Sequence, residues 1–300
     1  MNTLQALAIG TLLSAAGLLS AADARSDNSA VRTSNATNAS DDQIEFITSP
    51  DRIKNVASNG APMAIWEALE HGEKVECLDC IASVEPLLYD QNARTREISA
   101  WWLRRRILGV FGSGEVYERT VKTLAGDASP QRRAYAAYAL GEFLAPPGIT
   151  ACATALTKDA DGSVRAAAAS ALGRLNDDGG GALATALADS DARVKVAALN
   201  SAGRINVFSG AANLAALAGD GEATVRRRAV EVLESLHVKD SVASVLALAK
   251  NDPDATVRAA ACHALGSFAD ASTQASLTSI AANDTSSLVR DQAKIALRRL

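Results

Sequence analysis

The 300-residue chain has few aromatic side chains. Phe, Trp and Tyr together make up 4% of it, although 48% of its residues are hydrophobic. Much of that hydrophobic fraction is alanine, the strongest helix former, which also lets neighbouring helices approach closely. The composition therefore favours thin core layers between many short helices packed in series.

Charge of one sign does not dominate either. Thirty Lys and Arg residues face 34 Asp and Glu residues, for a net charge of −4. Nucleic-acid-binding domains usually show a basic excess or stripe. Two short basic clusters occur at 104–106 and 226–228, and helix-end or inter-repeat pairing explains them, because basic groups offset the dipole at helix C-termini. We expect no nucleic-acid partner.

Histidine is nearly absent. His71, His237 and His263 lie far apart in the sequence, which argues against a shared metal site. No Ser-His-Asp hydrolase is expected, because short repeat turns supply no converging loops. We therefore predict no metal, no other cofactor and no catalytic residue.

The N-terminal segment predicts export. Leu4 to Leu19 is apolar and is followed by Ala22-Asp23-Ala24, a cleavage-like pattern, so residues 1–24 read as a signal peptide. An uncleaved membrane anchor is the rival interpretation; otherwise no segment is long enough to span a membrane. Residues 25–60, polar at their start, are expected to be a disordered linker. These features predict a periplasmic or secreted protein of a bacterial envelope.

One framework recurs seven times after this segment. An Asp precedes a basic residue by six positions, and an Ala-rich helix follows, with Leu seven positions after the basic residue in six of the copies. The anchors are Asp90/Arg96, Asp127/Arg133, Asp159/Arg165, Asp189/Lys195, Asp220/Arg226, Asp252/Arg258 and Asp284/Arg290, with basic residues spaced by 37, 32, 30, 31, 32 and 32 positions. Such a period is typical of stacked repeats. We predict an all-α solenoid of about seven two-helix repeats over residues 61–300.

Local signals place helices within each repeat. Ser163 and Thr256 are expected N-caps of second helices, since hydroxyls satisfy free amides at a helix start. Pro62 to His71 reads as a short helix that caps the first repeat, with Pro in its first turn and Gly72 at its end. The final helix, predicted at Leu288 to Leu300, lacks a polar capping unit. Its outer side is therefore expected to be covered by a partner or a second copy, or to remain a modest apolar end.

This repeat pattern resembles that of the HEAT-repeat family, in particular its short, Ala-rich type named after phycobilisome lyases. The resemblance rests on DGSVRAAAASALGRL (161–175), DATVRAAACHALGSF (254–268) and EATVRRRAVEVLESL (222–236), and it covers about residues 75–300. The family includes scaffolds, chromophore lyases and hydroxylases. The hydroxylases bind di-iron through His-Glu pairs, but Gly72, Val238 and Ala264 follow the three histidines here, so that activity is not implied.

The resemblance also implies a ladder formed by the seven Asp and seven basic anchors. A turn Asp and a helix-start Arg can hydrogen-bond each other and nearby carbonyls, because Arg carries five donors in a fixed fork. Such a ladder should orient the repeats more than it adds net stability.

Cys77-Leu78-Asp79-Cys80 is the sharpest local motif. Haem attachment would need a His where Ile81 stands, and a thioredoxin-like site would need a strand and helix. A zinc site could enlist His71 but has no evident fourth ligand. A structural disulfide in an oxidising compartment is the favoured interpretation, and buried or free thiols and redox or metal work are the alternatives. Cys152 and Cys262 read as small core residues.

The second helices should line the concave wall of the solenoid. The position before each basic anchor and positions three, six and seven after it are apolar and should face the core. Positions one, two and five should face the groove, which brings together Ile98, Trp101, Tyr135 and Tyr138 and places Glu231 and His263 further along. Exposed Trp and Tyr dominate binding interfaces, so the first cluster predicts a site for a protein or peptide. Packing against a cap around Trp66 is the alternative. The chain is thus interpreted as an exported, non-enzymatic scaffold, or alternatively as an enzyme or enzyme accessory, either lyase-like or thiol-redox through Cys77/Cys80.

Overall fold

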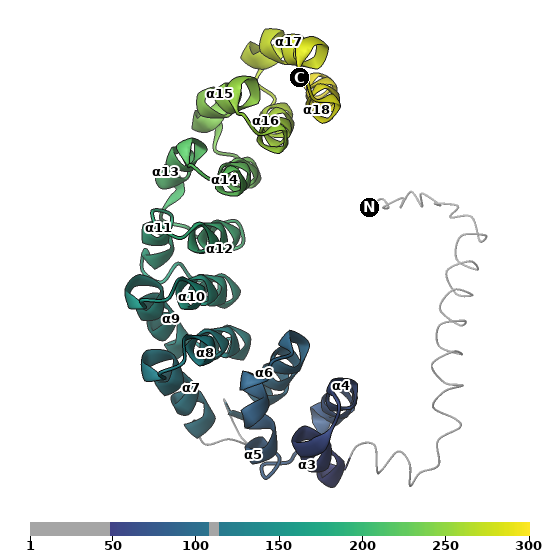
Figure 1. The fold of residues 1–300 in the computed structure, drawn as a ribbon, viewed down its shortest axis with the longest axis vertical. Helices are drawn as coiled ribbons and strands as arrows, with labels where there is room; N and C mark the ends of the chain where they lie inside the picture. Colours follow the sequence, from purple (N-terminus) through teal and green to yellow (C-terminus); the bar gives the residue numbers. More distant parts are fainter. Residues whose placement is uncertain (1–48, 108–113) are drawn as a thin grey trace, which may run out of the picture.

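The computed structural model describes residues 49–107 and 114–300. Helix pairs stack side by side into a curved solenoid, with one helix of each pair on the inner, concave wall (Figure 1). The described residues contain no strand, so the all-α prediction is confirmed. The predicted signal peptide and most of the predicted linker lie outside the described residues.

Two cap helices precede seven repeats. The cap comprises α3 (Pro50–Asn59), α4 (Pro62–His71) and the 3₁₀ turn η1 (Gly72–Lys74). The outer elements are α5 (Ile81–Val84) with η2 (Glu85–Tyr89), α7 (Glu115–Gly126), α9 (Pro147–Lys158), α11 (Ala182–Ala186), α13 (Ala211–Leu214) with η3 (Ala215–Gly219), α15 (Val242–Asn251) after η4 (Lys239–Ser241), and α17 (Gln274–Asn283) after η5 (Ala271–Thr273). The inner helices are α6 (Ala93–Ile107), α8 (Pro130–Phe143), α10 (Gly162–Leu175), α12 (Ala192–Ala202), α14 (Ala223–Ser235), α16 (Ala255–Phe268) and α18 (Ser287–Leu297).

The cap begins earlier than the sequence suggested. The predicted helix at Pro62–His71 is confirmed as α4, but residues 50–59, assigned to the linker, form α3. Ser49 caps α3 by accepting a hydrogen bond from the amide of Arg52 at 3.2 Å, and Pro50 occupies its first turn. Ile53 on its inner face is fully buried. Most residues of α3 are polar, so the composition of this segment did not indicate a helix.

Two of the inner helices, α10 and α16, start two residues earlier than predicted. Asp161, rather than Ser163, is the N-cap of α10, and its carboxylate accepts the Ser163 amide at 2.8 Å. Asp254 caps α16 in the same way, at 2.7 Å from the amide of Thr256. A carboxylate satisfies a free amide and also interacts favourably with the helix dipole, so the charged residue takes the cap.

Close helix contact within the core depends on small residues. A Cβ atom on Gly141 of α8 would lie 2.9 Å from the Cα atom of Ala171 in α10, and one on Gly266 would lie 2.7 Å from the Cα atom of Ala296. Ala168, Ala169 and their equivalents, except Lys294 in the last repeat, are buried between repeats. The alanine-rich layers predicted from the composition are therefore the layers that bind successive repeats.

The last helix differs from the prediction of an apolar end. Position four after the basic anchor is buried and hydrophobic in the six preceding repeats, but in α18 it is Lys294, whose side chain is exposed and pairs with Asp291 at 3.1 Å. The outward face of α18 thus carries charge that the internal helices lack, although Leu288 and Ile295 are also exposed. Within the described ranges, no helix has the length and apolar character needed to span a membrane.

Candidate functional site

A ladder of ion pairs runs along the turns that start the inner helices. Five basic anchors bind the Asp of the next repeat: Arg133–Asp159, Arg165–Asp189, Lys195–Asp220, Arg226–Asp252 and Arg258–Asp284. In the four arginine rungs, Nε and Nη2 donate to the two carboxylate oxygens at 2.7–2.9 Å. Nη1 donates to the carbonyl of the Asp in its own repeat. Each arginine therefore joins two consecutive turns.

The carboxylates of the five rungs are held ionised by their partners. All seven turn Asp residues accept a backbone amide two residues further on, at 2.7–2.9 Å. Hydrogen bonds from the arginine lower the pKa values of Asp159, Asp189, Asp252 and Asp284, although burial opposes the shift. For Asp220 burial is the largest single effect, and the bonds from Lys195 and the Glu222 amide together outweigh it, so its pKa is also lowered.

Acid should therefore destabilise the solenoid through the ladder. A carboxylate whose pKa is lower in the folded state contributes stability above its unfolded pKa of about 3.9 and loses it as the pH falls through the folded value. We expect the urea midpoint to fall steadily as the pH drops from about 5 to about 3. Glu142, whose pKa is raised mainly by burial, works in the opposite direction but is a single group. A midpoint that stays constant or rises over this range would contradict the assignment.

The first junction of the ladder has a different arrangement. Arg96 donates through Nη1 to the carbonyls of Asp90 and Gln91, at 2.7 and 3.0 Å, but it does not reach Asp127. Its guanidinium instead lies over the ring of Tyr135, 3.8 Å from the centroid. Asp127 binds Arg132 of its own repeat at 3.0 Å. The predicted ladder is thus interrupted between the first two repeats.

The ladder also stops before its last predicted anchor. Arg290 of α18 donates through Nη1 to the carbonyls of Asp284 and Thr285 in its own turn, at 2.7 and 3.2 Å. Among the described residues it makes no ion pair with a carboxylate. The prediction that Arg290 is a full rung is therefore corrected: it fixes its own turn but does not join two repeats.

Two neighbouring hollows open at the first junction, on the inner wall. The first, about 300 Å³, lies between α6 and α8 and is lined by Leu88, Ala93, Arg96, Glu97, Ala100, Tyr135, Tyr138, Ala139, Glu142 and Arg174. The second, also about 300 Å³, is lined by Glu70, Arg94, Glu97, Ile98, Trp101, Arg104, Glu142 and Arg174. They share Glu97, Glu142 and Arg174, and we call the pair the N-terminal hollow.

The N-terminal hollow combines aromatic rings with paired charges. The Tyr138 side chain is 43% exposed, whereas Trp101 and Tyr135 are partly buried. Glu142 pairs with Arg174 at 2.5 Å, and Arg94 bridges Glu97 and Glu70 at 3.3 and 3.1 Å. The repeat pattern did not single out these charged residues. The 37-residue spacing, which departs from the common period, was the available signal.

The other predicted wall residues occupy varied positions. Ile98 is buried, 3% exposed, so the expectation that it faces the groove is corrected; it lies beneath the second hollow because a hydrophobic residue there packs inward. Glu231 of α14 pairs with Arg228 at 2.9 Å, and His263 of α16 lies 3.2 Å from Glu234. These two residues belong to repeats further along the solenoid and do not join the N-terminal hollow (Figure 1).

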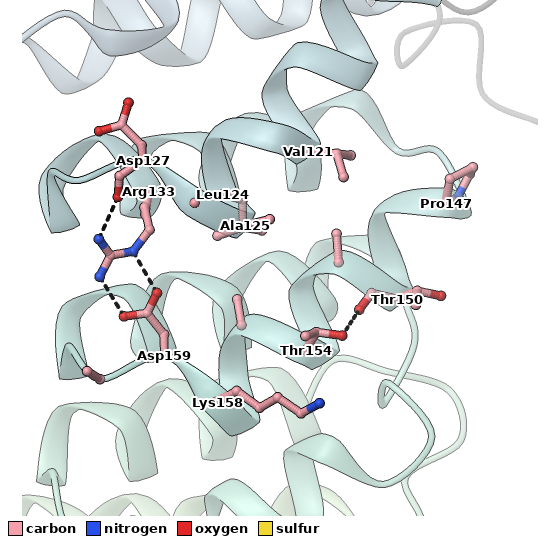
Figure 2. A pocket seen from close by; sticks show the side chains of 14 residues that line it. Val121, Leu124, Ala125, Asp127, Arg133, Pro147, Thr150, Thr154, Lys158 and Asp159 are labelled. Carbon is pink, nitrogen blue, oxygen red and sulfur yellow. Dashed lines mark hydrogen bonds and ion pairs between the residues drawn. The ribbon is translucent and has the colours of Figure 1, made fainter.

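The sequence analysis did not predict a larger groove on the outer side of the solenoid. It measures about 650 Å³ and lies between α7 and α9, with Val121 and Leu124 on one wall and Thr150 and Thr154 on the other (Figure 2). The Arg133–Asp159 rung closes one end of it. The Thr154 hydroxyl donates to the Thr150 carbonyl within its own helix, at 2.8 Å. Small side chains on both helices create the space, and no aromatic anchor lines it.

The four cysteines fall into two classes. Cys77 and Cys80 are joined by a disulfide, and both are buried beside the cap, with the Cys80 sulfur 3.5 Å from the Pro50 carbonyl. Cys152 and Cys262 are free and fully buried. Burial raises the pKa of each free thiol to about 12. In the described residues, no group of three or more His, Cys, Asp and Glu side chains is placed to hold a metal ion.

Thiol titration should separate these classes. Because only the thiolate reacts and both free thiols are buried, we expect no thiol to react with Ellman's reagent in the native protein at pH 8. Unfolding in guanidinium should expose two thiols, and prior reduction should expose four. Reaction of Cys77 or Cys80 in the native, unreduced protein would favour the redox alternative.

Comparison with known proteins identifies these repeats. Residues 117–203 and 210–298 match the model of HEAT repeats, more than half of the chain. The chain belongs to the HEAT-repeat family. No curated protein sequence matches it. The predicted fold and family are therefore confirmed.

Solved structures with HEAT-like folds are similar at low sequence identity. The Escherichia coli protein YibA has a TM-score of 0.55 and 16% identity, over 86% of this chain and 96% of its own. Kap95p, in a structure with RanGDP, has a TM-score of 0.54 and 14% identity, over 85% of this chain and 46% of its own. The phycocyanin lyase complex CpcE–CpcF of Nostoc sp. PCC7120 has a TM-score of 0.41 and 19% identity, over 72% and 86%. At these identities the likeness concerns the fold.

Proposed function

We propose that the protein is an exported, non-enzymatic scaffold that binds a protein or peptide on its concave wall, at the N-terminal hollow. The observation that carries the proposal is the grouping of Trp101, Tyr135 and Tyr138 beside four arginines in two adjoining hollows. Aromatic and arginine side chains supply most of the energy at protein interfaces. Kap95p, which has a similar fold, is described as binding RanGDP, and this supports protein binding as a use of the fold.

Substitution of the aromatic anchors tests the binding role. We expect Trp101→Ala and Tyr138→Ala each to weaken capture of the natural partner at least tenfold, which corresponds to an anchor worth about 1.4 kcal/mol or more. Val207→Ala is the matched control, because Val207 is 80% exposed and lies outside the hollow. Undiminished capture by both aromatic variants would locate the partner elsewhere.

Export forms a separate part of the proposal. It rests on the apolar segment and cleavage-like triplet within residues 1–24. N-terminal sequencing of the mature protein from the periplasm or medium should begin at residue 25, whereas an intact N-terminus in the membrane fraction would indicate an anchor.

Self-association through α18 remains a prediction with a clear test. Stacking two copies end to end would bury the Asp291–Lys294 pair, which costs free energy that the exposed Leu288 and Ile295 must offset. Sedimentation of wild-type protein and Ile295→Asp at equal concentration decides between a dimer that uses this face and a monomer.

A further inference from the structure

We infer that the N-terminal hollow receives a carboxylate from the bound partner, an Asp or Glu side chain held by Arg96. This inference rests on the proposed function, because it assigns the chemistry of the partner at that site. It begins with the interruption of the ladder at the first junction.

The ladder itself shows what an arginine at this position binds. In four rungs Nη1 is fixed by carbonyls of its own repeat, while Nε and Nη2 hold a carboxylate at 2.7–2.9 Å. Arg96 keeps the first half of this arrangement, with Nη1 on the carbonyls of Asp90 and Gln91. Among the described residues, Arg96 makes no hydrogen bond through its Nε or Nη2. The carboxylate-binding half of the fork is therefore free.

The chain's own Asp127 is unable to fill this place. Its Oδ1 accepts a hydrogen bond from the amide of Ser129 at 2.8 Å, and its Oδ2 accepts one from Nε of Arg132 at 3.0 Å. The ring of Tyr135 lies against the Arg96 guanidinium, at a position where the third and fourth repeats have Ala167 and Ala197. Both oxygens of Asp127 are engaged, so it makes no bond to Arg96.

The surroundings of the free fork suit a carboxylate side chain from outside. Arg96 lines a hollow of about 300 Å³, at the lower end of the range for small-ligand sites and large enough for one or two side chains of a peptide. The Tyr135 hydroxyl accepts a hydrogen bond from Nε2 of Gln131 at 2.8 Å, so its own hydrogen is free to be donated to a ligand. Glu97 and Glu142 also line the hollow, but each is paired, with Arg94 and Arg174 respectively. Their repulsion of an incoming carboxylate is thereby reduced.

A short peptide probe tests the fork directly. We would titrate ¹⁵N-labelled protein with acetyl-Ala-Asp-Ala-amide and follow the Nε–H resonances of the arginines. The expected result is a saturable shift of the Arg96 resonance with a Kd in the millimolar range, at least tenfold weaker for the Asn peptide. The Arg165 resonance is the internal control, because its fork already holds Asp189.

Arg290 supplies a second internal control. Its Nη1 is fixed by carbonyls of its own turn, as in Arg96, but it lines neither part of the N-terminal hollow. We expect the Kd measured from the Arg290 resonance to be at least tenfold higher than the Kd measured from the Arg96 resonance, because the hollow contributes to binding. An equal shift of both resonances would mean that any free guanidinium binds the probe, which would overturn the inference.

Variants of Arg96 then separate charge from fork geometry. Arg96→Gln should abolish the Asp-specific binding, measured by the shifts of neighbouring backbone amides. Arg96→Lys should weaken it several-fold while preserving the fold, since Lys195 occupies the equivalent position in the fourth repeat and still binds Asp220. Equal binding of the Asn peptide, tighter binding of inorganic phosphate, or unchanged binding by Arg96→Gln would each overturn the inference.

Capture of the natural partner distinguishes this failure from failure of the proposed function. Loss of capture by both Tyr138→Ala and Arg96→Gln supports both conclusions. Loss of capture by Tyr138→Ala with full retention by Arg96→Gln would support the proposed scaffold function and overturn the inference that Arg96 binds a carboxylate of the partner. Full retention by Trp101→Ala, Tyr138→Ala and Arg96→Gln removes the hollow as the partner site.

Discussion

Replacing Trp102 with alanine should lower the free energy of unfolding by about 4 kcal/mol, the usual cost of deleting a fully buried large aromatic. Trp102 is 1% exposed, and its indole Nε1 donates to the Gly72 carbonyl at 3.0 Å. The Arg106 guanidinium lies 3.5 Å from its ring and donates to the carbonyls of Gly72, Glu73 and Val75 at 2.7–3.1 Å. These contacts hold the cap on the first repeat.

The cap should also uncouple from the solenoid in this variant. Burial is the main cause of a pKa for Arg106 of about 10, which shows how closely the cap encloses that side chain. Because each repeat contacts only its neighbours, hydrogen exchange should lose protection in residues 50–74 while the C-terminal repeats stay protected. Trp101→Ala is the matched control, since Trp101 is of equal size but only partly buried. An equal loss of stability in the two variants would contradict this role of Trp102.

Trp101 and Trp102 show which features of the structure the repeat pattern predicts and which it does not. Register alone assigned position five after the anchor to the concave wall and position six to the core, and Trp101 and Trp102 follow that division. The partner of Trp102 could not be read in the same way. The Gly72 carbonyl lies 30 residues earlier, in a cap that has no repeat to place it. Periodicity predicts which side chains turn inward, but not what a non-repeating segment brings to them.

The same limit explains the candidate site. Five rungs follow from the period, because equal spacing sets each Asp beside the basic residue of the preceding repeat. The 37-residue spacing and Tyr135 break that geometry at one junction, and the hollow opens there. Pairings such as Glu142 with Arg174 depend on the distance between neighbouring helices, which a single sequence does not specify. Sequence reasoning therefore located the wall and its aromatics but missed the charged lining.

Replacing Asp252 with alanine should cost about 3 kcal/mol, near the lower end for breaking a buried ion pair. Asp252 and Arg226 are 6% and 8% exposed, the most enclosed rung of the ladder, and the variant leaves the guanidinium without its carboxylate. Asp291→Ala is the control, because its pair with Lys294 is exposed and should contribute less than about 1 kcal/mol. Urea unfolding of both variants gives the comparison.

A double-mutant cycle with Arg226→Met shows whether this rung couples the fifth and sixth repeats. If most of the loss in Asp252→Ala comes from the unpaired guanidinium, the double variant should recover part of it, with an interaction energy of about 2 kcal/mol. Unfolding should also become less cooperative in Asp252→Ala, because the last two repeats lose a link to the rest of the array. Strictly additive losses with unchanged cooperativity would mean that the rung only aligns the turns. In that case the buried alanine layers alone would hold successive repeats together.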